Sequence, residues 1–435
     1  MILSLVLLAF TISTYFLAQY GNMPKDVYQF LALSVLQYGL YFYLLKRIFS
    51  EKKLPILLIT ICSVACMGIY LYFPPKLSND VYRYLWDGLV QKEGYNPYLY
   101  VPGDWKFHDL QEANMQLFRH VDWRDKFTPY PPVAQYIFKE AHTLFDQYGI
   151  IGGKFLFALP IILSAILLYF LVDKKLYALF ILNPLLLLEI IANSHLDGWV
   201  IFFMIAGLYL YQRKKYIPAS LVWTLAIATK VYPIIFVPFF LFDMIKKKKF
   251  LEVIVSIILS SGLLYLLYRP FIAESYFPIM HYLTLPNEQE YNASLYRYLY
   301  LLLGVNTPGV YILAAKICGY VFAIGALILL ILKKYSYSLL LAVGILYLLC
   351  SPIVFPWYSL FTLTFVLFHI WQTKDFRMMY FYAFIQLLMT IIYFEPGKLV
   401  LREIMLNMEY FLLLISILLY TKILKNNYFS KKSSR

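Results

Sequence analysis

The segment from Leu54 to Phe73 reads LPILLITICSVACMGIYLYF and contains no charged side chain. About 20 apolar residues are the length that an α-helix needs to cross the hydrocarbon core of a bilayer. Further apolar runs of spanning length occur along the chain, among them Phe155–Val172, Phe250–Tyr268, Val310–Leu332 and Val400–Leu424. The sequence therefore predicts an all-α, polytopic transmembrane protein.

The composition agrees with a membrane protein, and the placement of the basic residues indicates which partners to expect. Hydrophobic residues make up 62% of the chain and charged residues only 14%, which is too apolar for a soluble domain of this size. The net charge is +14, but basic residues gather in short turns between apolar runs: Lys46-Arg47, Lys174-Lys175, Arg213-Lys214-Lys215, Lys246–Lys249 and Lys333-Lys334. Such turns mark cytoplasmic loops. We therefore expect a cell-membrane protein of about 12–14 spans, with both termini cytoplasmic and no nucleic-acid partner.

Long polar segments fall on the opposite, extracytoplasmic side of this predicted topology. The largest covers residues 74–153 and the second covers residues 269–308. No Gly/Ser-rich linker or internal repeat separates a further domain, so residues 1–435 are predicted to form a single integral membrane domain. Any chemistry is expected in the outer segments, because they hold nearly all of the unusual polar residues.

The first outer loop opens with Ser78-Asn79-Asp80-Val81-Tyr82-Arg83-Tyr84-Leu85-Trp86-Asp87-Gly88. At 100° per residue, Asp80, Arg83, Tyr84 and Asp87 share one helical face, and Val81, Leu85 and Trp86 share the other. Such a helix is expected to lie flat on the membrane with its apolar side down. Two interpretations stay open: an acid/base centre at the lipid boundary, or an interfacial anchor helix whose charges are solvated.

A second candidate is Lys230, which interrupts an apolar region. Its flanking arms, Ile217–Ala228 and Ile234–Ile245, are each too short to cross a bilayer alone. Irregular backbone at membrane depth is tolerated where it lines a protein cavity. Lys230 is therefore either a functional cation beside a broken helix or a lysine whose ammonium group snorkels to the interface.

The remaining candidates also lie in predicted outer segments. They are Tyr130 in the rigid turn Thr128-Pro129-Tyr130-Pro131-Pro132, the pair His195 and Asp197 beyond a helix end, Arg297, and Trp357-Tyr358. Each has a structural alternative: a helix cap or surface position for His195 and Asp197, and interfacial anchoring for Arg297, Trp357 and Tyr358.

The first-loop sequence, followed by Gly94-Tyr95-Asn96-Pro97-Tyr98, resembles polyprenol-phosphate-sugar-dependent glycosyltransferases of the C-type (GT-C) superfold. The likeness is greatest to bacterial mannosyltransferases and more distant to the first GPI mannosyltransferase. Tyr130-Pro131-Pro132, His195-Leu196-Asp197 and Lys230-Val231-Tyr232-Pro233 are similar to family elements in the family's order. The GPI enzyme has an acid-x-acid pair in this loop. Here the sequence is Asn79-Asp80-Val81, so the resemblance does not support a two-acid metal site. No cofactor is predicted with certainty, and a divalent cation stays an open alternative that the sequence does not support.

The resemblance implies transfer of a sugar from a polyprenyl-phosphate donor to a glycan or glycolipid acceptor at the outer face of the membrane, with inversion. Mannose is the commonest donor sugar of the family. Such a donor has a good anionic leaving group, so the protein must supply a base for the acceptor hydroxyl and cations for the departing phosphate.

Asp80 is the predicted base, and Asp87 is the second choice or an orienting partner of Arg83. The predicted phosphate ligands are Arg83, Lys230 and Arg297. The predicted sugar- or acceptor-binding residues are Tyr130, His195, Asp197, Trp357 and Tyr358.

Two other functions fit part of the same pattern. A lipid-linked glycan flippase or secondary transporter also uses broken helices with buried cations, but transporters concentrate polar residues at the midplane and keep their loops short. An O-antigen polymerase or ligase also has large outer loops. We would expect it to depend on outer arginines and histidines, without an acid placed directly after a span.

Overall fold

The computed structural model describes residues 2–21, 25–272 and 295–391. Within these ranges the regular elements are all helices, so the predicted all-α class is confirmed. The predicted span Val400–Leu424 and residues 273–294 of the second predicted outer loop lie outside the described residues.

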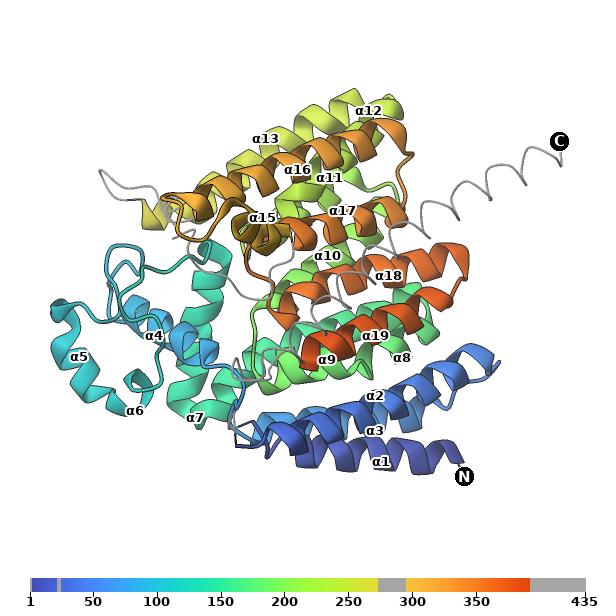
Figure 1. Cartoon of the computed structure of the whole chain (residues 1–435), viewed down its shortest axis with the longest axis horizontal. Helices are drawn as coiled ribbons and strands as arrows, with labels where there is room; N and C mark the ends of the chain where they lie inside the picture. Colours follow the sequence, from blue (N-terminus) through green and yellow to red (C-terminus); the bar gives the residue numbers. More distant parts are fainter. Residues whose placement is uncertain (1, 22–24, 273–294, 392–435) are drawn as a thin grey trace. The chain divides into compact units, whose positions relative to one another are not determined.

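The chain divides into two compact units, and Figure 1 labels their helices. The first unit comprises residues 1–237 and 244–285. Its helices are α1 (Ile2–Leu17), α2 (Val27–Ser50), α3 (Ile56–Tyr72), α4 (Asp80–Lys92), η1 (Trp105–Phe107), α5 (His108–Ala113), α6 (Met115–Phe118), α7 (Pro132–Leu167), η2 (Leu168–Val172), α8 (Lys174–Ile181), α9 (Pro184–Leu186), η3 (Leu187–Ala192), α10 (Asp197–Gln212), α11 (Tyr216–Ile227), η4 (Tyr232–Phe236), α13 (Phe250–Tyr268) and η5 (Arg269–Phe271).

The second unit comprises residues 238–243 and 286–435. Helix α12 (Val237–Lys246) contributes its central residues to this unit. The other described helices are α15 (Leu295–Leu303), α16 (Val310–Leu332), α17 (Tyr337–Cys350), η6 (Pro356–Ser359), α18 (Leu360–Thr373) and α19 (Arg377–Ile391). The prediction of a single membrane domain concerns the whole chain and stays a prediction.

Several helices have the length and composition of membrane spans. Among the described residues, three helices are long and apolar enough to cross a membrane, namely Pro132–Val172, Phe250–Phe271 and Val310–Leu332. A bent pair of helices over Lys174–Ala192 can count as a fourth span. Shorter apolar helices include α1, α3, α11, α17 and α19. The apolar helices are those expected of a membrane protein, whereas the larger predicted number of spans and the sidedness stay predictions.

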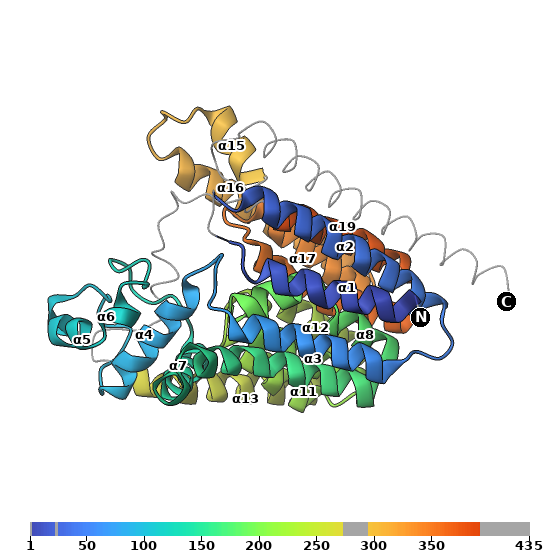
Figure 2. The same cartoon turned by 90° about the horizontal axis from the view of Figure 1, so that it is seen from below.

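The first three helices form a layer in the first unit. Helix α1 packs against both α2 and α3, and Figures 1 and 2 show the three side by side. The short helices α4, α5 and α6 gather beyond one end of this layer, at the left of both views. The chain therefore passes directly from the end of α3 into the polar loop region that begins with Asp80.

Helix α7 accounts for the second half of the predicted outer loop 74–153. Pro132 is its first residue, a position where the missing amide proton of proline costs no helical hydrogen bond. The helix is interrupted at Gly149, whose φ of 66° lies in the left-handed region that glycine adopts without strain. The segment before Gly149 packs against α4, and the segment after it continues into the apolar part of the helix.

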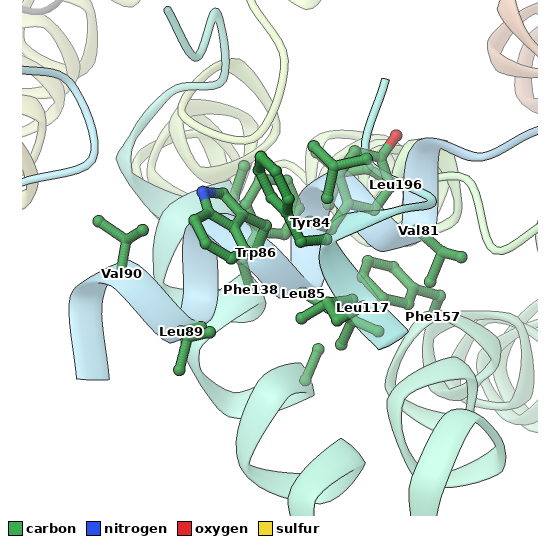
Figure 3. Close-up of a cluster of buried hydrophobic side chains, with 14 of the residues drawn as sticks. Val81, Tyr84, Leu85, Trp86, Leu89, Val90, Leu117, Phe138, Phe157 and Leu196 are labelled. Atoms are coloured by element: carbon green, nitrogen blue, oxygen red, sulfur yellow. The ribbon is translucent and has the colours of Figure 1, made fainter. Parts of the chain in front are cut away.

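The packing of α4 corrects one expectation. Its apolar face does not lie open to lipid, because Val81, Leu85 and Leu89 are buried in a core cluster with residues of α6 and α7 (Figure 3). Tyr84, from the predicted polar face, is buried in the same cluster and stacks on Phe138 with ring centroids 4.5 Å apart. The aromatic residues make both faces suitable for burial, so the helix is a packed element of the protein.

Candidate active site

Asp80 is the first residue of α4, and two contacts fix the short connection from α3 that leads to it. The buried Lys154 ammonium group of α7 donates hydrogen bonds to the carbonyl oxygens of Tyr70 and Phe73, each at 2.6 Å. The Leu77 amide donates to the side-chain oxygen of Asn193 at 3.3 Å. Lys154 thereby supplies hydrogen-bond donors to carbonyl oxygens at the C-terminal end of α3, which have no partner within the helix. Together the two contacts hold the start of α4 beside the turn that follows η3.

The Asp80 carboxylate faces a tyrosine pair and a histidine. The Tyr84 hydroxyl donates to Asp80 Oδ2 at 3.2 Å, and the Tyr130 hydroxyl donates to Tyr84 at 3.4 Å. His195 Nε2 lies 3.8 Å from Asp80 Oδ2. The Asp80 side chain keeps 30% of its surface exposed, whereas His195 is fully buried. Asp80 is therefore the acid of this cluster that a substrate can reach.

The turn between η3 and α10 places His195 and Asp197 on the inner side of the site. Ser194 adopts a left-handed φ of 62°, which is uncommon for a residue other than glycine. The His195 amide then donates to the Glu189 carbonyl oxygen at 3.1 Å. Asp197 is the first residue of α10 and is fully buried. The turn is held in a sparsely populated conformation, as is frequent at functional sites.

Asp197 forms an ion pair with Lys230, which lies between the end of α11 and the start of η4. The Lys230 ammonium group lies 2.6 Å from Asp197 Oδ2, and the Tyr232 hydroxyl donates to Asp197 Oδ1 at 3.3 Å. Lys230 follows α11, whose last turn is joined to α7 because the Val133 amide donates to the Ala228 carbonyl oxygen at 2.9 Å. The break between α11 and η4, inferred from the two short apolar arms, is thus present, and Lys230 lies at it.

Burial and charge act in opposite directions on the two central titratable groups. Burial raises the pKa of Asp80 above its ordinary value; the Lys230 cation and the Tyr84 hydrogen bond oppose this shift. Burial lowers the pKa of His195 well below its ordinary value, and Lys230 adds to this shift. His195 is therefore neutral near pH 7, and Asp80 is a stronger base than an exposed aspartate.

The comparisons with known proteins cover this same part of the chain. Residues 69–246 match the family model alpha-(1->6)-mannopyranosyltransferase, N-terminal domain. A curated relative from Corynebacterium glutamicum, alpha-(1->6)-mannopyranosyltransferase A, is 24% identical over 179 residues, which are 39% of this chain and 35% of the relative. The chain thus aligns with about a third of that relative's length. No solved structure matches the chain.

The match confirms the resemblance to bacterial mannosyltransferases. Asp80, Tyr130, His195, Asp197 and Lys230 all lie within the segment matched by the mannopyranosyltransferase model. The predicted residues Arg297, Trp357 and Tyr358 lie beyond it.

Within the matched segment, Arg83 and Asp87 form a pair apart from Asp80. Arg83 Nε lies 2.9 Å from Asp87 Oδ1, and its other nitrogens donate to the carbonyl oxygens of Trp123 at 2.9 Å and Lys126 at 3.0 Å. Both side chains are buried. The guanidinium group therefore attaches the loop segment 123–126 to α4. Asp87 is its ion-pair partner, and partnership with Arg83 was one of the two roles predicted for Asp87.

The other three predicted residues belong to the second unit. Arg297 lies on α15, and Trp357 and Tyr358 lie in η6. The Trp357 ring stacks on Phe355 with centroids 4.4 Å apart and an interplanar angle of 3°. Their roles in the site stay predictions.

Sequence reasoning missed Glu189 and Asn193, which lie behind His195. Glu189 is fully buried in η3 and receives the Asn193 side-chain amide at 3.3 Å. The available signal was an acid within the apolar run Leu185–Ile191, since an ionisable residue in such a segment is a functional candidate. Among the residues that the structure describes, no three His, Cys, Asp or Glu side chains are grouped as metal ligands.

Proposed function

We propose that this protein is a membrane mannosyltransferase that takes its sugar from a polyprenyl-phosphate donor and delivers it to a glycan or glycolipid acceptor at the outer face of the membrane. The observation that carries the proposal is the convergence of Asp80, His195, Asp197 and Lys230 from three separate segments. All four lie in the part of the chain that matches the mannopyranosyltransferase model.

Asp80 acts as the general base in this proposal. It is partly exposed, and its raised pKa increases its affinity for the proton of an acceptor hydroxyl. The acceptor oxygen attacks the anomeric carbon as the bond from that carbon to the phosphate oxygen breaks, and the electron pair leaves with the phosphate. Attack from the face opposite the leaving group inverts the configuration. Asp87 is engaged with Arg83, which favours Asp80 over Asp87 as the base.

Lys230 stabilises the departing phosphate. A cation in a poorly solvated site gains in effect as negative charge develops on the leaving oxygen. Asp197 holds the ammonium group in place before the donor binds. Arg297 is proposed as a second phosphate ligand. Arg83 is proposed to act indirectly, since its three nitrogens already bind Asp87 and the loop.

The sugar and the acceptor are proposed to bind on the exposed side of Asp80. Tyr130 is half-buried and borders Asp80 through Tyr84, which suits an aromatic wall against a sugar ring. Trp357 and Tyr358 are proposed to contribute further aromatic surface. His195 and Asp197 are fully buried, so we assign them to the support of Asp80 and Lys230.

A donor panel tests the function. Purified protein in lipid nanodiscs is given polyprenyl-phosphate mannose, polyprenyl-phosphate glucose or a nucleotide-linked mannose, together with an octyl α-mannoside acceptor. We expect a new mannoside only from polyprenyl-phosphate mannose. Movement of the intact lipid-linked sugar across a liposome membrane without any new glycosidic bond would instead identify a flippase.

A further inference from the structure

We infer that Glu189 and His195 form a proton relay behind Asp80, so that the base is a three-residue chain and not a single carboxylate. The inference deepens the proposed function and rests on it. Its geometric basis is a continuous line of groups: Asp80 Oδ2 lies 3.8 Å from His195 Nε2, and His195 Nδ1 lies 3.4 Å from Glu189 Oε2. Both Glu189 and His195 are fully buried.

The main chain fixes the tautomer of His195. Its Nδ1 lies 3.1 Å from the carbonyl oxygen of Glu189, and a carbonyl oxygen can only accept a hydrogen bond. Nδ1 therefore carries the proton, and in the neutral ring Nε2 presents a lone pair. Nε2 is the ring nitrogen near Asp80, 3.8 Å from Oδ2, so the proton-accepting side of the ring is the side of that carboxylate. His195 can thus accept a proton from Asp80, and negative charge on Glu189 must offset the burial and the Lys230 cation, both of which lower the pKa of His195.

Glu189 contributes the negative charge that such a transfer needs. Its Oε2 accepts a hydrogen bond from the Asn193 side-chain amide at 3.3 Å and lies 3.4 Å from His195 Nδ1, whose proton is shared with the Glu189 carbonyl oxygen. The amide N–H and the nearby imidazole N–H stabilise negative charge on this oxygen. Asn193 also accepts a hydrogen bond from the Leu77 amide. The same acid therefore supports His195 and, through Asn193, the connection to α4.

The proton path balances without any further reactant. The acceptor O–H bond breaks as the new glycosidic bond forms, and Asp80 takes the proton. Asp80 then passes it to His195 Nε2, which gives an imidazolium next to the Glu189 carboxylate. The proton returns through Asp80 to water once the product has left, and Asp80 is again ionised. The 3.8 Å separation must shorten for transfer, as distances between catalytic groups often do when substrate binds.

Glu189→Gln tests the relay because it keeps the size of the side chain and removes its charge. We expect the single-turnover rate of mannose transfer to fall about tenfold or more while the donor affinity is unchanged. Loss of this negative charge lowers the pKa of the Asp80–His195 pair, so the acid limb of the rate–pH profile should move to lower pH. The other groups that act on the pKa of Asp80, namely Lys230, Asp197, Asp122 and the Tyr84 hydroxyl, are unaltered. A purely structural role would reduce the rate equally at every pH.

Glu252→Gln is the matched control, since Glu252 forms a surface ion pair with Lys249 on α13. It should keep both the rate and the pH profile of the wild type. If wild type transfers mannose, Asp80→Asn does not, and Glu189→Gln retains the wild-type rate and profile, the relay is refuted while the proposed function stands. If wild type transfers no mannose, the proposed function fails.

The tautomer can be measured without substrate and without a variant. In wild-type protein labelled with nitrogen-15 histidine, solid-state NMR distinguishes the two ring nitrogens, and His195 is assigned through Ser194 and Leu196. At pH 7 we expect a neutral ring with the proton on Nδ1. A ring protonated on Nε2, or on both nitrogens, would overturn the relay whatever the fate of Glu189→Gln.

Discussion

The ammonium group of Lys230 lies 2.6 Å from the carboxylate of Asp197, and both side chains are buried at a break between two helices. Each charge is retained in the interior because the other compensates it. The pair also influences Asp80: Lys230 lowers the pKa of Asp80, and Asp197 raises it. The state of this pair therefore affects both the proposed base and the proposed phosphate site.

Removing the Lys230 charge should impair transfer strongly. Lys230→Met keeps the apolar stem and should cost about 2–4 kcal/mol of transition-state stabilisation, by analogy with the loss of one oxyanion donor. It also leaves Asp197 buried without this cation, so Lys230→Met with Asp197→Asn should regain stability but not activity. Single-turnover transfer and thermal unfolding of both variants measure the two effects. Lys139→Met, on the exposed side of α7, is the control. Near-normal transfer by Lys230→Met would exclude the residue from the phosphate site.

The pH dependence of the same variant has a defined sign. Because Lys230 lowers the pKa of Asp80, its removal raises that pKa, and a base with a higher pKa loses its proton only at higher pH. The acid limb of the rate–pH profile should therefore move upward in Lys230→Met. The measurement is the residual rate across pH 4 to pH 9 on the folded fraction. If the acid limb of Lys230→Met lies at the same pH as that of the wild type, Lys230 does not influence the pKa of Asp80.

The Arg83–Asp87 pair should govern stability more than chemistry. Asp87→Asn removes the charge that pairs with a buried guanidinium, and breaking a buried ion pair in this way typically costs about 3–5 kcal/mol. We expect a lower thermal unfolding temperature, with transfer per folded molecule within about tenfold of wild type. Asp109→Asn, at an exposed position, should change neither. An Asp87→Asn protein that is stable and inactive would return Asp87 to the role of base.

Gly88 should tolerate no side chain, because α4 and α7 approach each other there. A Cβ at this position would overlap the carbonyl oxygen of Phe138 and the side chain of His142. Gly88→Ala should displace α4, and overpacking of this kind costs about 1–3 kcal/mol. Thermal unfolding and transfer should both decline. The comparison is Gly39→Ala, where no atom lies close to the added carbon.

Sidedness can be tested with cysteines, since the four native ones are buried. Glu112→Cys, in the predicted first outer loop, should react with an impermeant thiol reagent added outside the cell. Arg213→Cys, in a basic turn, should react only after the membrane is opened. The reverse pattern would place the Asp80 site in the cytosol and remove the case for an outer-face donor.

Local sequence patterns predicted long apolar helices and singled out several residues that the structure brings together in the candidate site. The limits Phe250–Tyr268 and Val310–Leu332 agree with α13 and α16, because long uniform apolar runs leave little choice of structure. Asp80 and Lys230 were chosen as candidates because an ionisable residue next to or within an apolar segment is a functional candidate; their roles stay predictions.

The burial of α4 and the role of Glu189 were not predicted. Periodicity shows that α4 is two-sided, but it cannot tell whether lipid or α7 covers the apolar side. The contact between Glu189 and His195 depends on the left-handed residue Ser194, and no local pattern requires that conformation there.

The most direct test of the proposed function is single-turnover transfer by Asp80→Asn. The substitution keeps the shape of the side chain and removes the basicity that the acceptor hydroxyl needs. Wild type and Asp80→Asn are compared in nanodiscs with polyprenyl-phosphate mannose and octyl α-mannoside, with donor binding measured in parallel. We predict a rate lower by at least about 100-fold with unchanged donor binding. Asp80→Asn that transfers mannose at the wild-type rate would contradict the account.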